Sequence, residues 1–167
     1  MLNFASLETW AEMNNHLNLD SDWHCLNVQG RDPRAMVQQG PNIKVTIAAI
    51  SAGGTRLVEH VCGAIIDTGS ETSCVSLDMF AKLAGGVQGV RSVAHVYGNI
   101  TGERTVRASV SWLPEVAFER EFSLLKHLAP YGVLIGRDIL CECRFYLDIK
   151  SAFFCLCTPK AGIADQS

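Results

Sequence analysis

The chain has 167 residues, a length typical of one domain, and 48% of them are hydrophobic, which is enough to form a core. Only 19% are charged and the net charge is −3 with no basic stripe, which excludes a disordered chain and gives no electrostatic basis for binding nucleic acid or an anionic membrane. The N-terminal residues lack the basic start of a signal peptide, and no window is apolar over the roughly 18 residues of a membrane span, so we expect a soluble, cytoplasmic protein.

The first elements in chain order divide the sequence near residue 38. Within residues 1–38, Leu7, Trp10 and Leu17 roughly keep a helical period, so this N-terminal extension is expected to be partly helical. The stretch QGRDPRAMVQQGP, residues 29–41, carries glycine, proline and charge and is interpreted as a linker or turn. Residues 42–50 then alternate apolar and polar side chains, and residues 56–67 return as a second strand, which predicts a hairpin.

The later elements are a short helix and a series of strands. Ser76 is a good N-cap for a helix over residues 77–86, and Gly85 is expected to end it. Two alternating strands in 90–112 flank the polar tip 97–103, residues 115–125 predict another strand, and an apolar strand in 131–145 is broken by Gly136 and followed by a short helical stretch. Residues 145–157 predict a terminal hairpin, so many short strands with one or two small helices favour an all-β, closed or sandwiched fold.

A carboxylate stands at the end of the second predicted strand. Asp67 follows the apolar pair Ile65-Ile66 directly, a position where an ionised and unpaired carboxylate would be costly to bury. One interpretation is an Asx-turn in which Asp67 only caps the bend made by Gly69. That interpretation explains an Asp and a Gly, but not the whole quartet Asp67-Thr68-Gly69-Ser70 or the apolar VLIGRD stretch downstream.

Three motifs in this order, AIIDTGSETS, VYGNITGE and GVLIGRDIL, resemble those of a retropepsin-like aspartic protease, and the helix and terminal hairpin resemble cellular and bacterial members more than the minimal viral enzymes. The resemblance runs from Pro41 to Pro159. It implies a closed β-barrel or sandwich with a flap hairpin, a domain over residues 39–160 and a C-terminal tail over 161–167. It also implies no metal ion and no cofactor.

The resemblance implies a catalytic loop made of Asp67, Thr68, Gly69 and Ser70. In such enzymes two aspartates share one proton and activate a water molecule. The chain has no second Asp-Thr-Gly or Asp-Ser-Gly, so catalysis requires a homodimer that contributes Asp67 twice. Thr68 would hydrogen-bond across the two-fold axis, Gly69 would let substrate approach, and Ser70 would donate to Asp67 and thereby favour an acidic pH optimum.

The remaining site residues are expected around this loop. Strand alternation puts Ile65 on the side of Asp67 and Leu134 beside Gly136, so both are candidate walls of the substrate pocket. The flap tip would bind the peptide backbone, and a plain exposed hairpin is the alternative. Its candidate contacts are Tyr97, Gly98, Asn99 and Ile100, and the structural support is expected from Glu71, Gly136, Arg137 and Asp138, with an ion pair between Glu71 and Arg137 bracing the dimer.

Seven cysteines, at positions 25, 62, 74, 141, 143, 155 and 157, are interpreted as free, mostly buried thiols, because their number is odd and no export signal is seen. A metal site from Cys141-x-Cys143 and Cys155-x-Cys157 is an alternative, although structural zinc sites usually space their cysteines more widely. A cysteine protease using Cys74 with His95 or His127 is a further alternative, but no basic surroundings of Cys74 are evident.

The sequence therefore predicts an aspartic endopeptidase, acting as a homodimer on extended peptides with apolar residues at the cut. Two alternatives share the fold. One is a peptide-binding or dimerisation scaffold with little turnover, although such a scaffold has no reason to keep a costly carboxylate pair. The other is a protease domain that is autoprocessed from a larger precursor, with residues 1–38 covering the cleft.

Overall fold

The computed structural model describes residues 23–30, 32–95 and 98–160. Within them the chain divides into two compact units, one made of residues 42–139 and the other of residues 23–41 and 140–160. The helix predicted around Leu7 to Leu17 and the tail 161–167 lie outside the described residues. Within the described part of the chain, none of the helices has the length and apolar character needed to cross a membrane.

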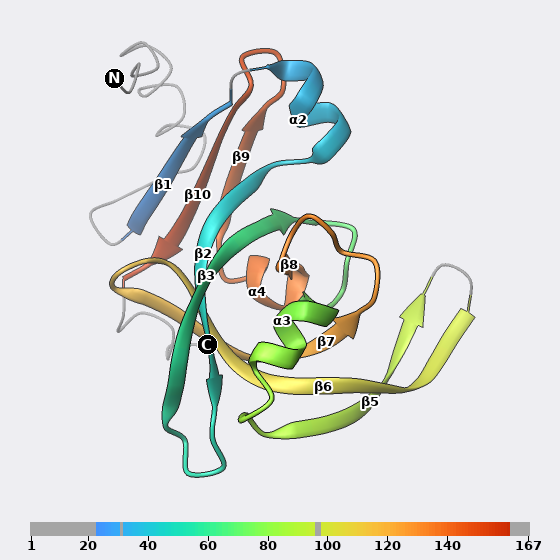
Figure 1. Ribbon diagram of the computed structural model, residues 1–167. Helices are drawn as coiled ribbons and strands as arrows, with labels where there is room; N and C mark the ends of the chain where they lie inside the picture. The colour runs from blue at the N-terminus through green and yellow to red at the C-terminus, as the bar shows by residue number, and fades with distance from the viewer. Residues whose placement is uncertain (1–22, 31, 96–97, 161–167) are drawn as a thin grey trace. The chain divides into compact units, whose positions relative to one another are not determined.

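The unit of residues 42–139 is a closed β-barrel (Figure 1). Its strands are β2 (Asn42–Ile50), β3 (Arg56–Ile66), β4 (Cys74–Ser76), β6 (Gly98–Leu113), β7 (Val116–Leu125) and β8 (Val133–Ile135). They pair in the order β2-β3-β8-β4-β7-β6, and β2 pairs again with β6, which closes the barrel. The predicted all-β class with a closed barrel is confirmed.

The barrel interior follows from strand alternation. In β2 the apolar Ile43, Val45 and Ile47 are buried while Asn42 and Lys44 are exposed, as the period-two pattern predicts. Side chains from the other strands meet them, and the fully buried ones include Val106, Val110, Phe122 and Ile135. Burial of apolar area at about 25 cal/mol per Å² is the main stabilising contribution to such a core.

Two helices belong to this unit. Helix α3 (Leu77–Lys82) begins where expected, because the Ser76 hydroxyl accepts a hydrogen bond from the Met79 N–H at 3.2 Å. It ends at Lys82, earlier than the expected stop at Gly85, since the backbone tightens there and the Ala84 N–H bonds to the Ala81 carbonyl. Helix α4 (Arg137–Leu140) is the short helical stretch predicted after Gly136.

A long hairpin extends from the barrel. Among the strands that the structure describes, β5 (Gln88–His95) pairs with β6 alone, and the two run out together beyond the barrel strands (Figure 1). The pairs Ala94–Asn99 and His95–Gly98 are the last before the tip. Val96 and Tyr97, at the tip itself, lie outside the described residues, as do the side chains of residues 93–101.

The second unit is a three-stranded sheet in the order β1-β10-β9, whose strands lie side by side in Figure 1. The terminal hairpin of β9 (Arg144–Asp148) and β10 (Phe153–Pro159) is confirmed, whereas β1 (Trp23–Gln29) was not expected within the N-terminal extension. Helix α2 (Pro33–Gln39) also corrects the interpretation of this stretch as a linker. Asp32 caps it by accepting from the Arg34 N–H at 2.9 Å, and Pro33 occupies the first helical position, where its missing N–H costs nothing.

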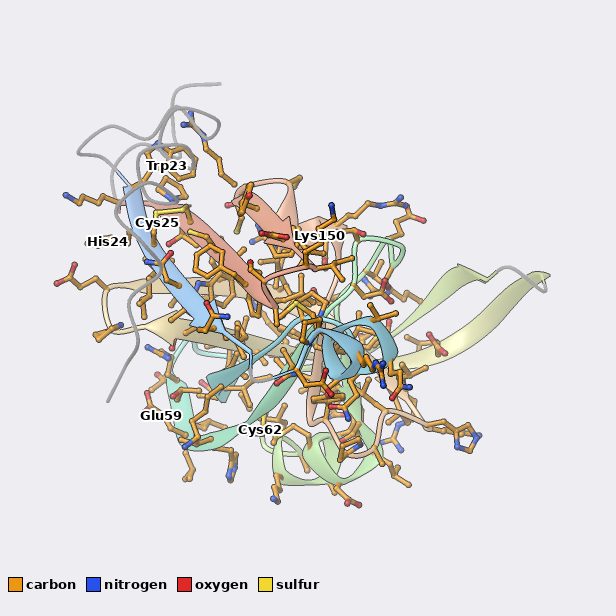
Figure 2. The ribbon with its side chains drawn as sticks, turned by 90° about the horizontal axis from the view of Figure 1, so that it is seen from above. Trp23, His24, Cys25, Glu59, Cys62 and Lys150 are labelled. Atoms are coloured by element: carbon orange, nitrogen blue, oxygen red, sulfur yellow. A yellow bond between two sulfur atoms is a disulfide. The ribbon has the colours of Figure 1, made fainter. Side chains whose placement is uncertain are left out.

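A disulfide corrects the expectation that all cysteines are free. It joins Cys25 on β1 to Cys157 on β10, which stand directly opposite each other in the sheet (Figure 2). The remaining thiols are free and range from buried, at Cys74 and Cys155, to exposed, at Cys141. The disulfide was missed because its partners are 132 residues apart and the sequence gives no sign of β1.

Candidate active site

The structure brings the two most specific motifs together at one end of the β3–β8 pair. These strands run parallel, with Ile65 beside Leu134 and Ile66 beside Ile135. The Asp67 N–H continues the ladder by donating to the Ile135 carbonyl at 3.0 Å. Asp67 and Gly136 therefore leave adjacent strands at the same edge of the sheet, where a loop can present a side chain.

Asp67 forms the Asx-turn that was considered as an alternative. Its Oδ1 accepts from the Gly69 N–H at 2.8 Å, and its carbonyl accepts from the Ser70 N–H at 3.3 Å. The Asp67 side chain is nevertheless only half-buried, and its Oδ2 receives no hydrogen bond from residues 23–30, 32–95 or 98–160. The turn fixes one carboxylate oxygen and leaves the other available for chemistry.

Thr68 and Gly69 form the exposed corner of this turn. A Cβ on Gly69 would lie 3.1 Å from the Asp67 Oδ1, a contact tight enough to disturb the carboxylate. A side chain at position 69 would also stand in front of the oxygen that the turn holds. The bond predicted for Thr68 across a two-fold axis stays a prediction, because it needs a second copy of the chain.

Ser70 has a different role from the one expected. Its hydroxyl donates to the Thr72 carbonyl at 2.7 Å rather than to the Asp67 carboxylate. This bond stabilises the loop that follows the turn, so Ser70 shapes the loop instead of adjusting the charge of Asp67. The expected acidic optimum loses the hydrogen bond on which it was based.

Four hydrogen bonds tie this loop to the second motif. The Arg137 N–H donates to the Ser70 carbonyl at 2.9 Å and the Asp138 N–H donates to the Glu71 carbonyl at 3.2 Å. The Ser73 hydroxyl accepts from the Gly136 N–H at 2.9 Å and donates to the Asp138 Oδ1 at 2.7 Å. Ser73 is fully buried, so its bond with the Gly136 N–H is shielded from water, whereas its bond with the half-buried Asp138 is only partly shielded.

Ser73 is a residue of the candidate site that sequence reasoning missed. A lone serine beside cysteine and valine gives only a weak signal, namely a hydroxyl next to an apolar segment. In the structure its hydroxyl bonds to both Gly136 and Asp138. Asp138, expected only to support the site, thus holds the Asp67 loop through a side-chain bond as well as through its backbone.

Gly136 is required by close backbone contact. A Cβ there would lie 2.6 Å from the Thr72 carbonyl carbon, 2.7 Å from its oxygen and 3.0 Å from the Ser73 nitrogen. Real Cβ atoms do not approach backbone so closely, so any larger residue must push the two segments apart. The supporting role expected for Gly136 therefore has a geometric basis.

Glu71 and Arg137 both have exposed side chains. Their backbones are part of the loop connections described above. An ion pair between these two side chains, expected to brace a dimer, stays a prediction. Their exposure leaves both charges accessible to a second copy of the chain.

The predicted pocket walls Ile65 and Leu134 do meet. They belong to a small apolar cluster on the side of β3 and β8 toward which strand alternation also directs Asp67. The cluster consists of Ile65, Cys74, Leu125, Leu128, Tyr131 and Leu134. Its members range from buried to half-buried, so it offers an apolar surface next to the carboxylate.

Cys74 belongs to this cluster rather than to a nucleophilic pair. Burial raises the pKa of its thiol to about 11, and the Glu103 carboxylate adds to the shift, while Arg91 opposes it. A thiol with this pKa is almost entirely protonated at neutral pH and is a poor nucleophile. This raised pKa therefore argues against the cysteine-protease alternative.

A cavity of about 440 Å³ adjoins the apolar cluster at the base of the β5–β6 hairpin. Leu125 belongs to both, and the cavity carries opposite charges on Glu103 and Arg104. It is lined by Gly102, Glu103, Arg104, Leu124, Leu125, Lys126 and His127. The contacts predicted for Tyr97 and for the side chains of Asn99 and Ile100 lie outside the described residues, and Gly98 begins β6 and pairs with His95.

No protein-family model matches the chain, and no curated protein sequence matches it. Among solved structures, the chain is similar to the crystal structure of the retroviral protease-like domain of Ddi1 from Leishmania major. The two are 14% identical, the TM-score is 0.37, and the match covers 76% of this chain and 98% of that one. This distant similarity supports no conclusion about activity, and the assignment of a closed barrel is based on the strand pairings alone.

Proposed function

We propose that the chain is one half of an aspartic endopeptidase, which becomes complete when two copies place their Asp67 loops against each other. The observation that carries the proposal is the half-buried Asp67 carboxylate, held at one oxygen by the Gly69 N–H within a loop fastened to Gly136 and Asp138. A lone Asx-turn needs no such fastening. A catalytic carboxylate does, because small errors in position cost much of the rate.

In the proposed dimer the two carboxylates lie about 3 Å apart and share one proton, as in known aspartic proteases. The ionised carboxylate takes a proton from a water molecule held between them as its oxygen attacks the peptide carbonyl. The protonated partner donates to the oxygen on which negative charge develops. The same groups then return a proton to the leaving amine. Because water is the nucleophile, no covalent acyl-enzyme forms.

The proposed substrate is an extended peptide with apolar side chains at the cut. The apolar cluster that contains Ile65 and Leu134 supplies a wall for such a side chain. The cavity at the hairpin base extends this surface, and the β5–β6 hairpin would act as the flap, its backbone pairing with the peptide as an added strand. We expect neither a cofactor nor a metal ion at this site, and a cytoplasmic location remains part of the proposal.

The decisive test compares wild type with Asp67→Asn in digestion of a peptide library, with sedimentation of the same samples. Asp78→Asn is the matched control, since it makes the same chemical change at an exposed acid in the first turn of α3. Wild type and the control should cleave, and Asp67→Asn should lose cleavage by about a thousandfold or more while remaining a dimer.

Two results would overturn the proposal in different ways. Equal cleavage by wild type and Asp67→Asn would assign the chemistry to other residues. Dimers that do not cleave in either form would favour the scaffold alternative. Loss of mass from stored wild type, but not from Asp67→Asn, would instead identify autoprocessing by the proposed site.

A further inference from the structure

Three cysteine sulfurs converge in the three-stranded sheet. The Sγ atoms of Cys25, Cys155 and Cys157 all lie within 4.8 Å of one another, and the Cys155 and Cys157 sulfurs are 3.2 Å apart. Cys155 and Cys157 are fully buried and Cys25 is half-buried. Figure 2 shows Cys25 with its sulfur–sulfur bond on β1, close to Trp23.

The sheet geometry accounts for this convergence. Cys25 and Cys157 are direct partners in the β1–β10 ladder, so their side chains share one face. Cys155 precedes Cys157 by two residues and therefore points to the same face. Trp23, Tyr146 and Phe153 belong to the same apolar cluster as the three cysteines.

The disulfide uses only two of these sulfurs, and a bridge between Cys155 and Cys157 does not account for the third. Positions two apart on a strand have Cα atoms about 6.6–6.8 Å apart, at the limit of what a disulfide spans, so a Cys155–Cys157 bridge is disfavoured. A buried third thiol beside the disulfide therefore needs another explanation.

We propose that, once the Cys25–Cys157 disulfide is reduced, Cys25, Cys155 and Cys157 bind one soft, thiophilic metal ion of the Cu⁺ or Zn²⁺ class. A dithiol reductant supplies the two electrons and two protons that convert the disulfide into two thiols, and is itself oxidised to a disulfide. The ion then forms three metal–sulfur bonds and displaces one proton from each thiol. Soft thiolate ligands select ions of this class.

The distances and charges suit such an ion. Metal–sulfur bonds of about 2.3 Å place three sulfurs about 4 Å apart, so sulfurs already within 4.8 Å need only small movements. Arg144 stands opposite Cys157 in the β9–β10 ladder, and its guanidinium lies 4.1 Å from the ring centre of Trp23. A cation in this position offsets the negative charge that three thiolates leave around the ion.

Within residues 23–30, 32–95 and 98–160 the group of ligands contains only these three residues. Three sulfurs complete the coordination of Cu⁺ but leave one position of a tetrahedral Zn²⁺ site open. We therefore expect the site to prefer Cu⁺. Of the four cysteines considered from the sequence as an alternative metal site, Cys155 and Cys157 belong to this group, whereas Cys141 and Cys143 do not.

The test titrates Cu⁺, and separately Zn²⁺, into the full chain reduced by a phosphine under anaerobic conditions, each against a chromophoric chelator of that ion. Wild type should retain one ion per chain, and Cys155→Ser should weaken retention about tenfold or more. Cys141→Ser is the matched control, because Cys141 is an exposed free thiol, and it should bind as wild type does. Cys155→Ala serves as a second variant, and circular dichroism checks that both fold.

A second readout follows the thiols directly. The bound ion should protect Cys25 and Cys157 from alkylation by a maleimide, while Cys141 should react at an unchanged rate. No retention of either ion by reduced wild type would overturn the proposal. So would equal retention by wild type and both folded Cys155 variants, or an equal loss in Cys141→Ser.

Discussion

The buried hydroxyl of Ser73 provides the sharpest test of how the candidate site is held together. Ser73→Ala removes the acceptor for the Gly136 N–H, at 2.9 Å, and the donor to the Asp138 carboxylate, at 2.7 Å. An unsatisfied buried N–H costs about 1–3 kcal/mol, and a hydrogen bond to a charged group is worth about 1.5–3 kcal/mol. Because Asp138 is half-buried and water can replace part of the second bond, we expect a total loss of about 2–3 kcal/mol.

Ser109 gives a matched control in the same barrel. It is also fully buried, but its hydroxyl has no hydrogen-bond partner within the described part of the chain. Ser109→Ala removes an unpaired polar group, so its free energy of unfolding should stay within about 0.5 kcal/mol of wild type or rise. An equal change in the free energy of unfolding for Ser73→Ala and Ser109→Ala would refute the idea that the hydrogen bonds of Ser73 make it the more costly residue to replace.

The assay is urea unfolding of both variants, read from the shift in midpoint at constant slope. Peptide cleavage below the transition adds a second readout, because Ser73→Ala should also loosen the Asp67 loop and lower the rate. A Ser73→Ala variant within about 0.5 kcal/mol of wild type would show that this hydroxyl does not hold the two motifs together.

Three further predictions concern the same barrel and its proposed dimer. Gly136→Ala should lower the free energy of unfolding by about 2–3 kcal/mol, since its Cβ would lie 2.6 Å from the Thr72 backbone. Gly53→Ala is the control and should be near neutral, because the nearest atom to its Cβ lies at 3.9 Å, and equal urea midpoints of the two variants would contradict this prediction. When wild type is mixed with an equal amount of Asp67→Asn, about one quarter of the dimers should contain two Asp67 carboxylates, so cleavage per wild-type chain should fall to about half of that of wild type alone. Unchanged cleavage per wild-type chain would place the site within one chain. Burial raises the pKa of Cys74 from 9.0 to about 11, so the unfolded chain loses this proton first as pH rises, and the free energy of unfolding should fall between pH 9 and 11. Over this range Cys74→Val should lose on the order of 2 kcal/mol less than wild type in urea unfolding, and parallel curves for the two proteins would contradict the assignment.

Local patterns in the sequence predicted most of the barrel correctly. Alternation identified β2, β3 and β7, and the Ser76 cap placed the start of α3, because each of these signals depends on near neighbours. Such features are decided within a few residues and need no knowledge of the whole fold. Ile65 and Leu134 were expected only as walls of one pocket, and the β3–β8 register puts them side by side.

Features that depend on distant partners were not predictable in the same way. Strand β1 exists because it pairs with β10, which is more than 120 residues away, and its own sequence lacks a strict alternation. The role of Ser70 was assigned wrongly, since a hydroxyl has several acceptors within reach and only the folded loop selects the Thr72 carbonyl. Ser73 was missed for the same reason, as its partners come from a separate segment.

The β1–β10 ladder affects how the protein can be shortened. Cutting the chain near Gln38 removes all seven β1 residues that pair with β10, including the cysteine bound to Cys157. The exposed border of β10 would then carry the apolar segment Phe153-Phe154-Cys155-Leu156-Cys157 without a charged residue, which invites pairing with strands of other molecules. Lower activity or aggregation of such a truncated protein would thus reflect the loss of β1. A truncation that ends before Trp23 keeps β1 and therefore tests the role of the first residues separately.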